Sequence, residues 1–137
     1  FNFELEEEAS HEADYSVPLN YLYEPNAAIL KSGAFNSLAT RLKLKKLHKH
    51  SHLYTSQALI DFPGRSFKID TTSDYNVKHF KKTFKLTKAN VTTRNFPDTV
   101  SSIRKKLKLS DGGDIYLFFT TNLNNKKVVI RCTKTSS

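Results

Sequence analysis

The chain has 137 residues, of which 38% are hydrophobic and 12% aromatic, and this favours one soluble globular domain with a packed core over a disordered segment. Its 22 basic residues exceed its 13 acidic ones unevenly: residues 1–24 hold seven acids and no Lys or Arg, whereas residues 25–137 carry a local balance of +16. No apolar run approaches the roughly 18 residues that cross a bilayer, and the single cysteine excludes an internal disulfide or a cysteine-based zinc knuckle.

The N-terminal segment predicts the end of another domain. Residues 1–5 alternate apolar and polar side chains, which is typical of a strand, and an acidic run follows at 6–8. The chain contains no Met and begins inside this strand, so we interpret it as a piece of a longer protein. Residues 9–20 are small and polar and include Pro18, so 1–18 is expected to supply a terminal strand and a linker.

Two short helices are predicted next. Pro25 suits the first turn of a helix over residues 26–32, which Gly33 ends. A second helix is expected over residues 34–44, because its apolar residues recur at the spacing of one helical face.

The centre of the chain alternates strands with basic helices. Strands are predicted at residues 53–56, 66–70 and 91–96. Helices are predicted from residue 76 to about 88, with Phe80 and Phe84 on the apolar face, and from Pro97 to about 108. Five lysines lie outside the apolar face of the first helix, and Arg104, Lys105, Lys106 and Lys108 lie outside that of the second.

The C-terminal part predicts a hairpin. Residues 115–121 and 127–133 are rich in β-branched and aromatic residues, and an asparagine-rich turn joins them. Cys132 falls in the second strand, where a buried structural thiol is expected, and residues 135–137 read as a tail. The predicted fold is α/β (α+β), a mixed sheet flanked by helices, with two short N-terminal helices and a C-terminal hairpin.

The basic helices indicate a polyanion ligand, because attraction to phosphates requires only a high density of Lys and Arg on one face. Asp98 is the one acid between residues 78 and 108, whereas faces that serve solubility are usually mixed in sign. Tyr54 and Tyr75 are candidate exposed platforms for base stacking, whereas Phe80, Phe84, Phe118 and Phe119 occupy positions typical of a core. The predicted RNA-binding residues are Lys78, Lys81, Lys82, Lys85, Lys88, Arg94, Arg104, Lys105, Lys106 and Lys108.

Other chemistry has less support. The chain's four glycines form no Gly-rich turn after a strand, so no bound cofactor is expected. His48, His50 and His52 could present imidazoles to zinc or nickel, but incidental histidines at a loop explain them better. Asp111 and Asp114 flank two glycines, which a turn explains better than a calcium site. No catalytic residue and no metal site is therefore predicted.

Six short sequence motifs carry a family resemblance: residues 21–26 (YLYEPN), 46–48 (KLH), 52–56 (HLYTS), 61–65 (DFPGR), 94–97 (RNFP) and 112–118 (GGDIYLF). In this order they resemble the THUMP-like C-terminal domain of a bacterial family of class I S-adenosylmethionine-dependent methyltransferase-like proteins. The match covers about residues 20–134, so the domain is expected over 19–134, after a ferredoxin-like domain whose last strand falls within 1–18.

The resemblance implies an RNA-targeting accessory role, because THUMP domains deliver RNA-modifying enzymes to structured RNA, commonly tRNA. It implies a cytoplasmic protein whose full-length form binds S-adenosylmethionine and methylates RNA through a domain absent from this chain. The expected partners are tRNA or rRNA and the protein's own methyltransferase domain, with no membrane. The alternative is a non-catalytic scaffold that docks acidic segments of its own methyltransferase or of a partner protein.

Overall fold

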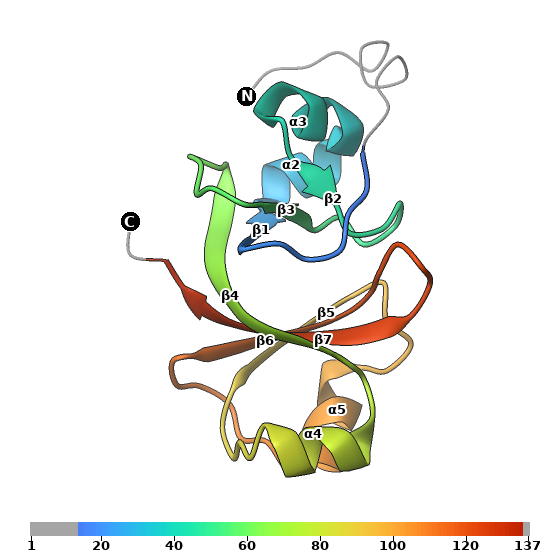
Figure 1. The fold of residues 1–137 in the computed structure, drawn as a ribbon, viewed down its shortest axis with the longest axis vertical. Helices are drawn as coiled ribbons and strands as arrows, with labels where there is room; N and C mark the ends of the chain where they lie inside the picture. The colour runs from blue at the N-terminus through green and yellow to red at the C-terminus, as the bar shows by residue number, and fades with distance from the viewer. Residues whose placement is uncertain (1–13, 136–137) are drawn as a thin grey trace.

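The computed structural model describes residues 14–135, so the strand predicted over residues 1–5 lies outside the described residues. One seven-stranded sheet in the order β2-β3-β1-β4-β7-β6-β5 separates two pairs of helices (Figure 1). The strands are β1 (Tyr21–Pro25), β2 (Lys45–Lys46), β3 (Tyr54–Ser56), β4 (Gly64–Asp74), β5 (Asn90–Arg94), β6 (Ile115–Thr121) and β7 (Lys127–Lys134). The fold is α+β with a mixed sheet, as the sequence predicts.

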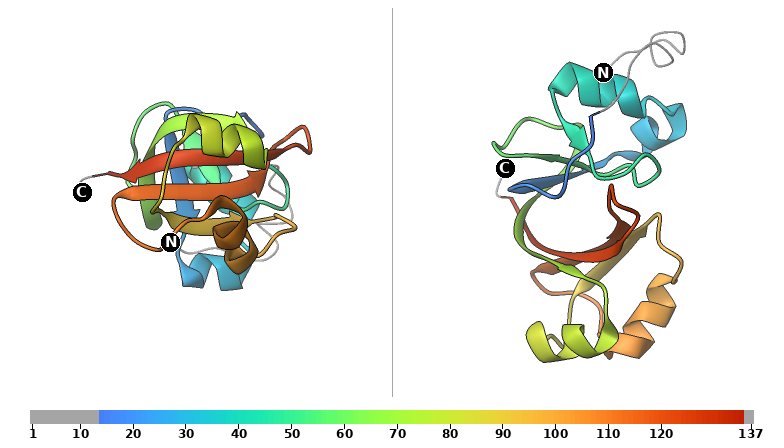
Figure 2. Two further views of the ribbon diagram at one scale, coloured as in Figure 1. Left: turned by 90° about the horizontal axis from the view of Figure 1, so that it is seen from below. Right: turned by 45° about the vertical axis from the view of Figure 1, so that its right-hand side comes forward.

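The longest strand, β4, connects the two halves of the sheet. Its first residues pair with β1 from Gly64 to Lys68, and its register with β7 runs from Phe67 to Asp74 with a shift between Ile69 and Thr71. All neighbouring strands are antiparallel except β5 and β6, which are parallel. The sheet curls strongly around this long strand, as the right-hand view in Figure 2 shows.

The upper helices are α2 (Ala27–Ser32) and α3 (Phe35–Leu42). The Ile29 backbone N–H donates to Asn26 Oδ1 at 3.0 Å and so caps α2, which Gly33 ends in the left-handed conformation at φ 72°. Both helices cover β1 and β3 through a core that includes Tyr23, Leu38 and Tyr54. The predicted end of the first of these two helices at Gly33 is confirmed.

The lower helices are α4 (Val77–Thr83) and α5 (Val100–Leu107), capped by the side chains of Asn76 and Thr99. Their apolar faces pack on one face of β6 and β7. The helix predicted as far as residue 88 stops earlier, because Lys85 takes a left-handed conformation at φ 51°. The residues of this lower core are Phe80, Phe84, Ala89, Ile103, Leu107, Leu109, Leu117, Phe119 and Val129.

The opposite face of β6 and β7 is buried as well. Phe118, Ile130 and Cys132 pack with Leu22 and Phe67 between the two halves of the curled sheet. Cys132 is fully buried, as predicted, and desolvation raises the pKa of its thiol well above the usual range. Because both faces of these strands are covered, the middle of the molecule is the most enclosed part of the core.

Three strand assignments from the sequence need correction. β1 was missed, because Pro25 suggests a helix start, whereas it is the last residue of that strand and Asn26 is the helix N-cap. β2 has only two residues, too few to produce a pattern in the sequence. β4 extends over 11 residues, well past the predicted 66–70, because its second half is exposed and carries polar side chains.

We expect Leu38→Ala and Phe84→Ala each to lower the free energy of unfolding by about 2–5 kcal/mol, because each truncation leaves a cavity in a separate core. Thermal or urea melts measure this directly. An unchanged midpoint for either variant would contradict the packing of that side chain in its core.

Candidate functional site

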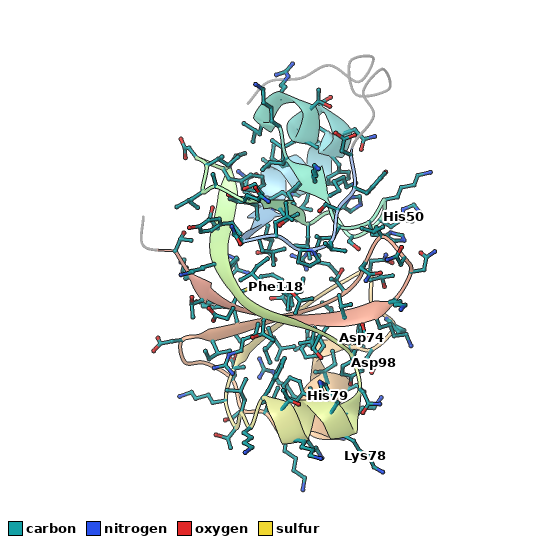
Figure 3. All side chains as sticks on the ribbon, in the orientation of Figure 1. His50, Asp74, Lys78, His79, Asp98 and Phe118 are labelled. Atoms are coloured by element: carbon teal, nitrogen blue, oxygen red, sulfur yellow. The ribbon has the colours of Figure 1, made fainter. Side chains whose placement is uncertain are left out.

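Nine of the ten predicted basic residues lie on or beside the two lower helices. We call this set the basic helix surface, and its members are Lys78, Lys81, Lys82, Lys85, Lys88, Arg104, Lys105, Lys106 and Lys108. The apolar faces of α4 and α5 are fixed against the sheet, so the lysines at the other helical positions face solvent. Lys78 extends from α4 away from the sheet in Figure 3.

Ion pairs neutralise only part of this surface. Arg104 Nη2 lies 2.9 Å from Asp111 Oδ1, and Arg104 Nη1 donates to the Ala89 carbonyl at 3.1 Å. Lys106 Nζ lies 3.1 Å from Asp98 Oδ2. The other seven members make no ion pair with any of the residues from 14 to 135, so the surface keeps a large positive excess.

Arg94 does not belong to this surface. Arg94 is the last residue of β5, and its side chain lies on the opposite face of the sheet. There its Nη2 lies 2.7 Å from Glu24 Oε2. Arg65 donates from Nε to the other carboxylate oxygen of Glu24 at 2.7 Å. We call Glu24, Arg65 and Arg94 the carboxylate triad.

The carboxylate triad joins strands that are far apart in the sheet. β1 and β5 are separated by β4, β7 and β6, yet a side chain of β1 pairs with a side chain of β5. The Glu24 side chain is 8% exposed, whereas those of Arg65 and Arg94 are 43% and 32% exposed. A buried carboxylate thus holds the curled sheet together at one rim, with two partly exposed guanidinium groups on its solvent side.

A second polar cluster links three loops at another place on the rim. His48 Nδ1 accepts from the His50 backbone N–H at 3.0 Å, so the proton of the neutral ring is on Nε2, which donates to Asn125 Oδ1 at 2.7 Å. Asn95 Nδ2 lies 3.2 Å from the same Nδ1, and Ser51 Oγ donates to the Thr121 carbonyl. These contacts give His48 a role in loop packing.

His52 occupies a different environment. Its ring stacks on Phe35 with 3.6 Å between centroids, and its Nδ1 lies 3.4 Å from Lys46 Nζ. Burial, and then the positive charge of Lys46, lower the pKa of His52 from 6.5 to about 4. The three histidines therefore do not converge on one point, and the residues from 14 to 135 contain no cluster of three metal-binding side chains.

The lowered pKa of His52 makes a testable contribution to stability. His52 stays neutral in the folded state while an unfolded His takes up a proton near pH 6.5, so its contribution is present above that pH and is lost as the pH falls toward about 4. We expect the melting temperature of His52→Asn to fall less than that of the parent across this window. The His79→Asn variant is the control and should follow the parent, because His79 is exposed on α4 and is not among the charged groups that act on His52.

The aromatic platforms predicted from the sequence are not available. Tyr54 is fully buried, so its prediction as an exposed platform is wrong; both faces of β3 are covered. Tyr75 packs edge-on against Phe96 and Phe119 and is half-buried. Tyr15, which the sequence did not single out, is 43% exposed and lies beside His48 and Leu123 in a shallow pocket.

Between residues 14 and 135, no helix combines the length and the apolar character that crossing a bilayer requires.

Two family models match adjoining parts of the chain. A model described as a ferredoxin-like domain matches residues 21–63, and one described as THUMP domain-like matches residues 64–134. The two models divide the range 19–134, which the sequence indicated as one domain, at the first residue of β4.

A crystal structure named as that of a putative methyltransferase from Porphyromonas gingivalis W83 is similar along nearly the whole chain. The two share 40% sequence identity with a TM-score of 0.93, and the similarity covers 99% of this chain. It covers 35% of the other chain, so the present chain spans about a third of that protein's length. No curated protein matches the chain.

Proposed function

Because this chain belongs to the THUMP domain-like family, whose model matches more than half of it, we propose that it is an RNA-binding accessory module. The observation that carries the proposal is the basic helix surface, where seven cations without an ion pair to a described residue gather on or beside two adjacent helices. Binding to phosphates needs only such a density of positive charge, because each neutralised phosphate releases condensed counterions.

The side chains of the basic helix surface favour structured RNA over an extended single strand. No exposed aromatic side chain lies among the lysines of α4 and α5, because Phe80 and Phe84 are buried in the lower core. Single-strand binding usually depends on such aromatic platforms, whereas double-stranded RNA is recognised through its backbone. We infer a folded RNA such as tRNA or rRNA as the partner.

We further propose that the module serves a methyltransferase. The named relative is about three times as long as this chain's match to it, which leaves room there for a catalytic domain. In this proposal the catalytic domain binds S-adenosylmethionine in the cytoplasm, and the present chain delivers the RNA. The described part of the chain offers no Gly-rich turn between a strand and a helix for this cofactor.

The salt dependence of tRNA binding tests the RNA proposal. If Z phosphates are contacted, log K should fall against log salt with a slope of about −0.7Z to −0.9Z. Gel-shift titrations at several salt concentrations give this slope. Absence of tRNA binding at low salt would contradict the proposal and favour a scaffold that docks acidic protein segments.

A further inference from the structure

The carboxylate triad lines a shallow surface pocket that the proposed function leaves unexplained. Its walls come from the end of β1, the start of α2, the start of β4 and the end of β5. The lining residues are Glu24, Pro25, Asn26, Ala27, Leu30, Gly64, Arg65 and Arg94. Glu24 is the one carboxylate among them, and two guanidinium groups face it, so the pocket has a net positive charge.

The two arginines retain hydrogen-bond donors after they have paired with Glu24. Arg65 uses Nε and Nη2 on Glu24, and Arg94 uses Nη2 on Glu24 and Nη1 on the Thr93 carbonyl. None of the hydrogen bonds within the described part of the chain involves Arg65 Nη1 or Arg94 Nε. A guanidinium group carries five N–H donors, so each arginine can bind a second acceptor.

The surroundings hold these donors in place. The Arg65 guanidinium lies 5.2 Å from the Phe67 ring centroid and 5.9 Å from that of Tyr116. Asn26 Oδ1 is occupied by the Ile29 N–H, which leaves the Asn26 Nδ2 group at the pocket surface. Gly64 lets the start of β4 lie close to the end of β1 beside the pocket, because a Cβ there would overlap the Glu24 carbonyl oxygen.

From this geometry we propose that the pocket binds a phosphate group between Arg65 and Arg94. Two fixed guanidinium groups match the oxygens of a phosphate better than mobile lysines do, because their planar donors form paired hydrogen bonds. The buried Glu24 carboxylate orients both arginines and prevents the site from carrying two uncompensated charges. The pocket lies on the opposite face of β5 and β6 from the lysines of α4 and α5, so it is a separate site.

Two kinds of ligand carry a phosphate group of this kind: RNA, as a backbone or terminal phosphate, and a small molecule. The RNA source rests on the proposed function, whereas the pocket itself does not. An RNA phosphate bound here would place the nucleic acid on both faces of the sheet and would orient it, which the lysines alone cannot do.

The test is a titration of the chain with inorganic phosphate, at constant ionic strength adjusted with sodium chloride, followed by the arginine Nε–H signals in NMR spectra. The signals of Arg65 and Arg94 should shift saturably, and that of Arg41 should not. Arg94→Lys preserves the charge but removes the planar donors, so it should weaken phosphate binding by about tenfold. Arg41→Lys is the control, because Arg41 is an exposed arginine of α3 that lies outside both the pocket and the basic helix surface.

The tRNA affinities of these variants show whether the bound phosphate belongs to RNA or to a small molecule. If Arg94→Lys weakens tRNA binding more than Arg41→Lys does, the phosphate belongs to RNA. If phosphate binds in the pocket while both variants bind tRNA like the parent, the phosphate site stands and its ligand is a small molecule. Arg65 and Arg94 signals in the parent that do not shift saturably with phosphate would overturn the proposal, even where the basic helix surface binds RNA. Arg65→Lys repeats the comparison at the more exposed arginine, should Arg94→Lys not fold.

Discussion

Charge reversal on the basic helix surface is expected to weaken tRNA binding by at least about tenfold and to flatten its salt dependence, because phosphate contacts are lost and like charges approach the RNA. The sequence alone suggests reversing Lys81, Lys82, Lys105 and Lys106. The structure improves this choice: Lys106 pairs with Asp98, so its reversal would place two carboxylates together. The better variant is Lys78→Glu, Lys81→Glu, Lys82→Glu and Lys105→Glu.

A matched control separates this surface from net charge. Four exposed lysines elsewhere can be reversed to give the same net charge, namely Lys31, Lys68, Lys126 and Lys134. Gel shifts should show a much smaller loss for this control, and thermal melts should show both variants folded, since exposed substitutions cost about half a kcal/mol or less each. Equal losses in the two variants would mean that binding follows total charge, and the basic helix surface would lose its support as the RNA site.

Replacing Glu24 with Gln is expected to lower the free energy of unfolding by about 2–4 kcal/mol. The change keeps the size of the side chain but leaves two guanidinium groups facing each other without their shared carboxylate. Full burial of the arginines would justify the upper end of the range for a broken buried ion pair, but both reach solvent, so the loss is smaller.

Urea denaturation measures this effect, with Asp61→Asn as the control because Asp61 is an exposed acid at the start of the turn before β4. The control should stay within about half a kcal/mol of the parent. Parent-like stability of Glu24→Gln would show that solvent and the remaining polar groups replace the carboxylate, and that the curled sheet does not depend on the carboxylate triad.

Local patterns made the basic helices predictable. Phe80 and Phe84 are spaced for one helical face, and the lysines around them then have to face solvent, so both the core and the charged face follow from a short stretch of sequence. The same holds for Ile103 and Leu107 in α5.

The carboxylate triad could not be predicted in this way. Arg94 lies between the two basic helices in the sequence, which suggests the same surface for it. The direction of its side chain depends instead on the pleat of β5, and its partner depends on how far the sheet curls. Glu24 and Arg65 belong to separate motifs of the family resemblance, and neither motif indicates that the two side chains form an ion pair. Contacts between residues 24, 65 and 94 exist only in the folded chain.

The length of β4 has a consequence for dissecting or recombining proteins of this kind. The boundary between the two matched families falls at Gly64, where β4 begins, so a cut there looks natural in a sequence alignment. Such a cut would expose the edge of β4 that pairs with β1 and would uncover Leu22 and Phe67 in the middle core. An exposed strand edge beside apolar side chains promotes aggregation. The two segments should therefore be transferred, expressed and inherited together, as one cooperative unit.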